Sequence, residues 1–186
     1  MLKQSLVLTK REDIETILQG CKTCRIAMVD EGRPYIIPMV FGYRWDGADL
    51  VLYFHCGLRG RKNRALRNNP QVCFEMDIEG ELIGSGEVAN RYSRAFSSLI
   101  GEGKVEFAQD LEQRRQGFEY IMRHQTGRGD YTYMDAYLAI AEVFWVRADS
   151  FKATRKLPPA GHPSGQPPRP EAPKDGVSVP EGHSFY

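Results

Sequence analysis

The residues best suited to chemistry lie where an apolar run, residues 52–56, gives way to a basic stretch. Gly57 and Gly60 permit tight backbone turns, and Arg61 and Lys62 stand where a helix is expected to begin. Free amides at a helix start, the positive end of the helix dipole and two cations together suit a phosphate group. This segment therefore predicts a site for a phosphorylated ligand.

The same charges allow a purely structural interpretation. Residues 57–70 carry three further arginines, so a solvated basic face explains the composition about as well as phosphate binding does: Arg59, Arg64 and Arg67. His55 lies near the end of the apolar run. A lone histidine at a strand end packs or forms a hydrogen bond more often than it catalyses, so we expect His55 to line the site and not to donate a proton.

The four cysteines offer a second possible chemistry. Cys21 and Cys24 form a C-x-x-C pair, whereas Cys56 and Cys73 stand singly within apolar stretches. A zinc site needs a second close pair or nearby histidines, and a thioredoxin-like pair follows a strand and opens a helix. Here the pair follows a predicted helix and precedes a predicted strand. We expect reduced, structural cysteines and no metal.

Two nucleotide-related signals are weak. The residue types and spacing of Gly84-x-Gly86-x-x-Ala89 match a dinucleotide-binding fingerprint. The segment lacks the strand-turn-helix setting and the acidic residue that such a site needs. The basic residues 57–70 could contact nucleic acid, but the balanced net charge and the lack of a base-reading module argue against it. We therefore expect no nucleic-acid partner.

Composition limits the remaining possibilities. The chain has 186 residues, 41% hydrophobic and 26% charged, with 25 Lys and Arg against 24 Asp and Glu and a net charge of +1. These values fit one soluble domain with a sizeable core, and they provide no global field for nucleic acid or anionic membrane. Apolar runs are too short for a membrane span or a signal peptide. We expect a cytoplasmic protein without a membrane partner.

Periodicity and turn residues predict the elements that position these groups. Thr9 and Glu12 form a capping box for a helix ending at Gly20, and Asp110 with Gln113 caps another ending near Gly127. A short helix fits within residues 57–70. Strands are predicted at residues 25–29, 35–41, 50–55, 72–76, 81–88, 99–107 and 139–146. Pro38 lacks an amide hydrogen, so its strand should be an edge or bulged.

Most predicted strands follow one another through short turns. This order favours a mainly β fold, a small antiparallel barrel with flanking helices, over a doubly wound parallel sheet. From Pro158 onward the composition changes, since this segment holds eight of the eleven prolines. We therefore expect one domain over residues 1–157 and a flexible Pro- and Gly-rich C-terminal tail over residues 158–186.

Several stretches occur in an order known from one protein family. They are residues 25–30, 34–43, 52–55 with Gly60-Arg61-Lys62, 69–75 and 98–107. Together they resemble the pyridoxamine 5'-phosphate oxidase-like FMN-binding split-barrel flavoproteins, most closely the nitroimidazole-resistance (Nim) branch. The likeness covers roughly residues 9–157. Each motif is weak alone, and their shared order and spacing make the assignment specific.

The resemblance implies FMN bound at the interface of a homodimer, with both subunits lining each site. Arg61 and Lys62 would hold the phosphate, and Ser98 would add a hydroxyl near the phosphate or ribityl chain. One residue departs from the pattern: many relatives carry an arginine where this chain has Ser97. The ring of the flavin would lie between two segments, Pro38, Met39, Val40 and Phe41 on one flank and Tyr53, Phe54 and His55 on the other.

The expected function is an FMN-dependent oxidoreductase that reduces small aromatic or nitroaromatic compounds with electrons from NAD(P)H. The flavin carries the redox chemistry, so the protein needs no catalytic acid and base pair, and we name no catalytic residue. Backbone amides of the strand through Phe41 could stabilise the reduced, anionic flavin. The alternative is a non-catalytic flavin- or haem-binding split-barrel protein.

Overall fold

The computed structural model describes residues 5–84 and 87–159, so the predicted tail lies outside the described residues from residue 160 onward. One antiparallel eight-stranded sheet organises the fold, in the order β3-β2-β6-β7-β8-β5-β4, with β1 paired to β8. The strands are β1 (Leu6–Leu8), β2 (Thr23–Asp30), β3 (Arg33–Val40), β4 (Gly42–Asp46), β5 (Asp49–Gly57), β6 (Gln71–Ile83), β7 (Ser93–Phe107) and β8 (Ala141–Lys156). The prediction of a mainly β, antiparallel split barrel is confirmed.

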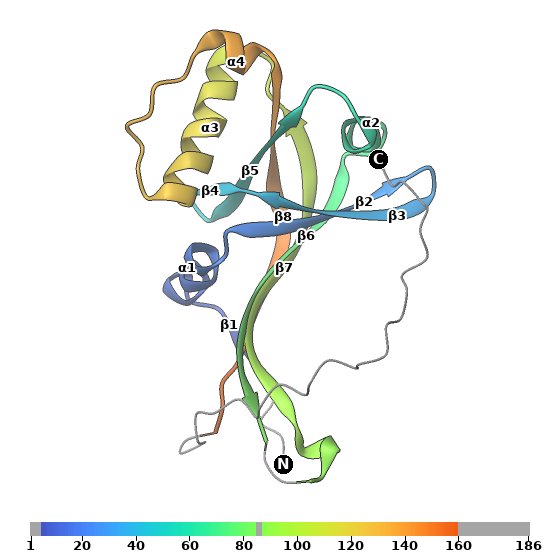
Figure 1. Ribbon diagram of the computed structural model, residues 1–186, viewed down its shortest axis with the longest axis vertical. Helices are drawn as coiled ribbons and strands as arrows, with labels where there is room; N and C mark the ends of the chain where they lie inside the picture. Colours follow the sequence, from blue (N-terminus) through green and yellow to red (C-terminus); the bar gives the residue numbers. More distant parts are fainter. Residues whose placement is uncertain (1–4, 85–86, 160–186) are drawn as a thin grey trace, which may run out of the picture.

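The helices lie around this sheet. They are α1 (Arg11–Gly20), α2 (Arg61–Asn68), α3 (Leu111–Thr126) and α4 (Asp135–Ala139), with one 3-10 turn, η1 (Ala89–Arg91). Figure 1 shows α3 and α4 on one flank of the curved sheet and α2 beside β2 and β3. The β6 and β7 strands continue away from the body as a long two-stranded arm (Figure 1).

Alternating side chains explain how one face of the sheet encloses the core. On β2, Cys24, Ile26 and Met28 are buried while the residues between them are largely exposed, the period-two pattern of a strand with one face in the core. Four phenylalanines from four strands or strand ends fill the centre, fully buried: Phe41, Phe54, Phe74 and Phe144. The core therefore fixes which face of each strand can meet a ligand.

Local signals predicted several details correctly. β3, which contains Pro38, is an edge strand of the sheet, where a proline without an amide hydrogen is tolerated. Asp110 caps α3 by accepting a hydrogen bond from the backbone amide of Gln113 at 2.8 Å. Gly127 ends α3 in the left-handed conformation, at φ 77°. These features are correct because each depends on residues close in sequence.

Other boundaries were predicted wrongly. Residues 72–76 and 81–83, expected in two separate strands, lie in one strand, β6, which ends at Ile83. Gly80 lies at a register shift against β7, between Glu79 and Leu82, and not at a turn. At Gly80 a Cβ would lie 2.8 Å from that of Ala95, so the glycine permits a close approach of two strands. Lys10, without a side-chain bond, precedes α1 in place of the expected cap by Thr9. β8 continues to Lys156, and α4 was not predicted.

Candidate functional site

The start of α2 is open to a ligand. Gly60 precedes the helix at φ 127°, a conformation that favours glycine, and no side chain caps the first amides. The first turn holds no acidic residue. The loop before it is fixed by buried Asn63, which donates from Nδ2 to the Gly57 carbonyl at 2.7 Å and accepts from the Cys56 thiol at 3.0 Å. Unpaired helix amides in a rigid loop are suited to an anion.

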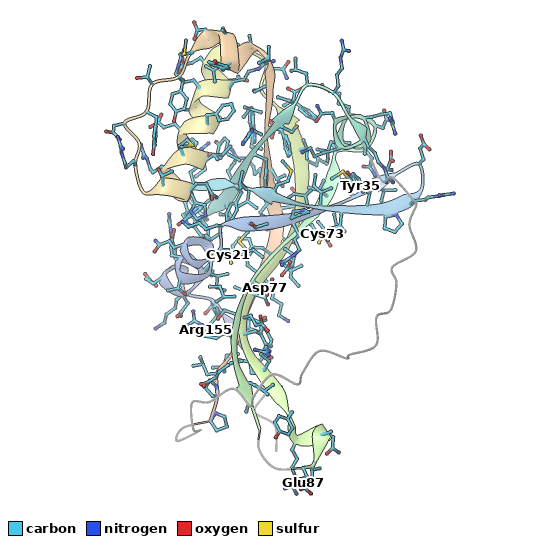
Figure 2. The ribbon with its side chains drawn as sticks, in the orientation of Figure 1. Cys21, Tyr35, Cys73, Asp77, Glu87 and Arg155 are labelled. Atoms are coloured by element: carbon cyan, nitrogen blue, oxygen red, sulfur yellow. The ribbon has the colours of Figure 1, made fainter. Side chains whose placement is uncertain are left out.

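Arg61 is held by two neighbours. Its Nε donates to Asp30 Oδ2 at 2.7 Å, and its guanidinium carbon lies 4.2 Å from the centre of the Tyr35 ring. Tyr35 lies on β3 next to α2 (Figure 2). Asp30 is buried, and its Oδ1 has no hydrogen-bond partner among the described residues. The predicted phosphate ligand Arg61 therefore has a fixed orientation.

Lys62 is differently placed. Its Nζ donates to Met39 Sδ at 3.6 Å, and within the described residues no carboxylate oxygen lies within 4.0 Å of it. Burial, and then the charge of Lys62, lower the pKa of His55, so this imidazole is neutral at pH 7. The His55 ring contacts Phe118 of α3, with centroids 4.9 Å apart. The structure thus brings the predicted residues Met39, His55 and Lys62 together.

The strand predicted to run beside the flavin ring presents two different faces. Pro38 and Val40 point outward and are exposed, whereas the side chains of Met39 and Phe41 are buried. Because β3 is an edge strand, one side of its backbone is free of strand partners within the described sheet. The Phe41 carbonyl accepts from Gln125 Nε2 at 2.8 Å, so α3 fixes the end of this strand.

Tyr53 and Phe54 are buried on opposite faces of β5. Tyr53 stacks on Tyr120 of α3 with ring centroids 4.6 Å apart, and its hydroxyl accepts from Arg44 Nε at 2.8 Å. Phe54 packs against Phe144 in the core. Neither side chain reaches an open surface in a single chain, so a contact of Phe54 with a ligand would have to come from its backbone.

Ser98 lies apart from α2 within one chain. Its Oγ is 3.0 Å from Thr154 Oγ1, and its register partner on β6 is Asp77. Asp77 lies six residues beyond Gln71, where the chain enters β6 after α2, a distance of about 20 Å along the strand. Figure 2 shows Asp77 toward the arm and Tyr35 beside α2. Ser98 shares the outward face of β7 with exposed Ile100.

That outward face of the sheet carries exposed apolar side chains beside the ion pairs of Arg25 with Glu75 and Asp77, and it is hollowed. Val29, Ile36 and Ile100 are 45%, 60% and 50% exposed on β2, β3 and β7. A groove of about 490 Å³ crosses β2 and β6, lined by Ala27, Met28, Val29, Pro34, Gln71, Val72, Cys73, Glu102 and Asp149. A monomer rarely leaves so much apolar sheet surface open to water, so this face is a candidate for contact with a second protein chain.

The cysteines do not form a second centre of chemistry. Cys21 and Cys24 are buried and unbridged. Burial raises the pKa of Cys21 to about 11 and raises that of Cys24 as well, which disfavours the reactive thiolate. In the described part of the chain, no three His, Cys, Asp or Glu side chains are grouped closely enough to hold a metal ion. None of its helices is long and apolar enough to span a bilayer.

Three residues of the site had no usable signal in the sequence. Asp30 reads as a turn residue before Glu31 and Gly32, and its contact with Arg61 joins positions 31 residues apart. Asn63 reads as a polar helix residue, although it is buried. Phe118 reads as part of an apolar helical stripe. Only the folded chain shows that they surround α2 and His55.

Comparison with known proteins places these features in a family. The sequence profile of the pyridoxamine 5'-phosphate oxidase family matches residues 10–156. A structure from Bacteroides thetaiotaomicron, described as a candidate 5-nitroimidazole antibiotic resistance protein, is 31% identical with a TM-score of 0.70, over 82% of this chain and 87% of that one. A search of curated protein sequences finds no significant match.

Two more distant structures share the fold. The flavocytochrome Anf3 from Azotobacter vinelandii is 17% identical with a TM-score of 0.68, over 95% of this chain and 89% of that one. The FAD and haem binding protein from Mycobacterium smegmatis has the same identity and TM-score, over 95% of this chain and 93% of that one. At this identity the likeness concerns the fold alone.

Proposed function

Because this chain belongs to the pyridoxamine 5'-phosphate oxidase family, we propose that it binds FMN and reduces small aromatic compounds, nitroaromatics among them, with electrons from NAD(P)H. The observation that carries the proposal is the start of α2, where uncapped amides, Arg61 and Lys62 lie without an acidic residue in the first turn. Such a donor set suits the phosphate of FMN.

The residues near α2 fit the cofactor. Lys62, free of carboxylate partners among the described residues, and the Nη groups of Arg61 would hold the phosphate. The open edge of β3 would supply backbone groups to the polar edge of the ring. Neutral His55 would form part of the wall. When bound, FMN supplies the hydride chemistry, and the protein's task is to bind it, orient it and exclude water.

The choice of a nitroaromatic substrate has separate support. The Bacteroides thetaiotaomicron protein is described by its link to 5-nitroimidazole resistance, and it is 31% identical to this chain over most of both lengths. Nitroimidazoles are small, flat and electron-poor, so they suit stacking beside a reduced flavin. The proposal therefore assigns the chain to flavin-dependent reduction of such rings.

We further propose a homodimer formed through the outward sheet face. Exposed Ile36 and Ile100 lie on this face, and Ser98 shares it. Pairing would bury the apolar surface and carry Ser98 toward the partner's chain, where it could complete the second phosphate site. Light scattering should give the dimer mass, and Ile100→Glu should shift the protein to monomer. A monomer mass for the unaltered protein at micromolar concentration contradicts this assembly.

The absorbance spectrum of the purified protein tests the function directly. We expect flavin bands, or their appearance after FMN is added and excess removed, and tighter binding of FMN than of riboflavin. Under anaerobic conditions NADH or NADPH should bleach these bands, and a nitroaromatic compound should restore them. A Soret band in place of flavin bands would support a haem-binding protein, and a colourless protein that refuses FMN would exclude the proposal.

A further inference from the structure

Asp30 is a buried carboxylate whose position the fold does not explain. The residue is 5% exposed at the end of β2. Its Oδ2 accepts from Arg61 Nε at 2.7 Å and lies 3.9 Å from Arg64 Nη2, while Oδ1 is buried without a hydrogen-bond partner among the described residues. An orphaned buried acceptor destabilises a folded protein. A neutral side chain here would avoid that cost, so the carboxylate calls for a functional reason.

The contact with Asp30 orients Arg61 and leaves its two Nη groups available for hydrogen bonds. Only Nε of the guanidinium is bound to Asp30, and its flat face lies over Tyr35 at 4.2 Å. The two Nη groups make no hydrogen bond among the described residues, and the side chain is 39% exposed. Arg61 is therefore fixed on one edge and one face, with its remaining donors available to a further acceptor.

We propose that Asp30 is a positioning residue for the anion site at α2, holding Arg61 in the orientation that binds a phosphate before the phosphate arrives. The inference rests on the proposed function, since FMN is the phosphate considered. A free arginine side chain loses rotamer entropy when it binds. Because Arg61 already pairs with Asp30 in the folded protein, its rotamer entropy is lost on folding, and ligand binding no longer carries this entropic cost.

If Asp30 acted through its charge alone, its removal would change phosphate affinity in the opposite direction, so an experiment can test the proposal. A carboxylate beside an anion site repels the incoming phosphate, so its removal should tighten binding if Coulomb interaction were its only role. If Asp30 acts through the orientation of Arg61, its removal should weaken binding although the site becomes more positive. The direction of the change separates the two.

The test compares FMN affinities, measured by quenching of flavin fluorescence at fixed ionic strength. Asp30→Ala removes both the charge and the acceptor, and we expect it to weaken FMN binding about tenfold. Asp30→Asn keeps an acceptor for Arg61 Nε, and we expect an affinity within about threefold of the unaltered protein. In an Arg61→Ala background, Asp30→Ala should cause no further loss. Equal or tighter binding by Asp30→Ala overturns the proposal.

A second measurement covers the case in which Asp30→Ala does not fold. In the unaltered protein without FMN, the Arg61 Nε hydrogen should already be protected from exchange in a proton-nitrogen NMR spectrum, with Arg61→Lys identifying its signal. An unprotected Nε–H that becomes protected only with FMN would show that the ligand, and not Asp30, orders Arg61, and would overturn the proposal.

Riboflavin separates this inference from the proposed function. It carries the same ring without the phosphate, and we expect Asp30→Ala to leave its affinity unchanged. If the unaltered protein binds FMN no more tightly than riboflavin, the phosphate site itself fails. If FMN binding depends on the phosphate and on Arg61 but not on Asp30, only the role of Asp30 fails.

Discussion

The helices α2 and α3 begin in contrasting ways. At α3 the carboxylate of Asp110 accepts from the Gln113 amide at 2.8 Å, and the Gln113 side chain accepts from the Gln109 amide at 2.8 Å. Glu112 adds a negative charge to the first turn. At α2, Gly60 offers no side chain, and the first turn holds cations and no acid. A side-chain acceptor caps the start of one helix, whereas no side chain caps the start of the other.

The C-terminal end of α3 also makes structural contacts, unlike the start of α2. His124 Nε2 lies 2.8 Å from the carbonyl oxygen of Cys21, and Gln125 Nε2 donates to the Phe41 carbonyl at 2.8 Å. These bonds tie α3 to the C-cap residue of α1 and to the residue that follows β3, both more than 80 residues away. α3 is therefore a structural brace. Changes at the two ends of α3 should mainly alter stability, whereas changes at Arg61 and Lys62 should mainly alter ligand binding.

The largest expected effect follows charge reversal at α2. Arg61→Glu combined with Lys62→Glu should lower FMN affinity more than about 100-fold, since it removes two charge-assisted bonds and adds repulsion. Both side chains are partly exposed and outside the apolar core, so the circular dichroism spectrum should stay unchanged, although loss of the pairing with buried Asp30 should lower the free energy of unfolding. Flavin content after gel filtration measures the loss.

A matched reversal near the end of α3 is the control. Arg123→Glu with Arg128→Glu changes the net charge equally and breaks two exposed ion pairs, with arginine side chains 60% and 61% exposed, together with the contact of Arg128 with the Tyr131 ring. Such pairs contribute little to stability, so FMN retention should persist. Undiminished flavin occupancy in the α2 variant, or equal losses in both, would contradict the assignment of the phosphate to α2.

The contrast also shows what the sequence could predict. Short-range rules predict three features from residues close in sequence: the start of α2, the cap of α3 and the edge position of the strand with Pro38. The alternation of β5 determines which face meets the core, but whether the other face is covered depends on α3. The resemblance therefore indicated Tyr53 and Phe54 as a segment without showing that both side chains are buried.

Long-range contacts account for the rest. Asp30 meets Arg61 only when the end of β2 reaches α2, and the register of β7 on β6 keeps Ser98 away from α2 of the same chain. Two strands were predicted where β6 is continuous, because a glycine such as Gly80 is compatible with both a turn and a close approach of strands, and only the partner strand decides between them. In each case the contact that determines the structure is made by a segment distant in sequence.

A moderate effect is expected from removing the α3 cap. Asp110→Ala leaves the first amides of α3 without their acceptor and should lower the free energy of unfolding by about 1 kcal/mol. For a domain of this size the melting temperature should fall by about 2–4 °C. FMN affinity should not change. If Asp110→Ala lost FMN and kept its melting temperature, the assignment of a structural role to α3 and a binding role to α2 would be wrong.

The smallest effect concerns the pH dependence of stability at the other end of α3. Burial lowers the pKa of His124 below its ordinary value of 6.5, and Nε2 carries the hydrogen because a carbonyl can only accept. The unfolded chain therefore takes up a proton before the folded chain does as pH falls. Stability from neutral His124 is complete above pH 6.5 and is lost as the pH falls toward the lowered folded pKa.

His124→Gln removes this titration and can keep a donor to Cys21. Its free energy of unfolding, from urea titrations between pH 7.5 and 5.5, should fall less steeply than that of the unaltered protein. The difference should stay below about 1 kcal/mol because solvent screens a half-buried ring. His55, whose pKa is lowered in the same direction, should keep part of the slope in the variant. Identical slopes in the two proteins would mean that α3 does not hold His124 neutral, and the bracing contact with Cys21 would lose its support.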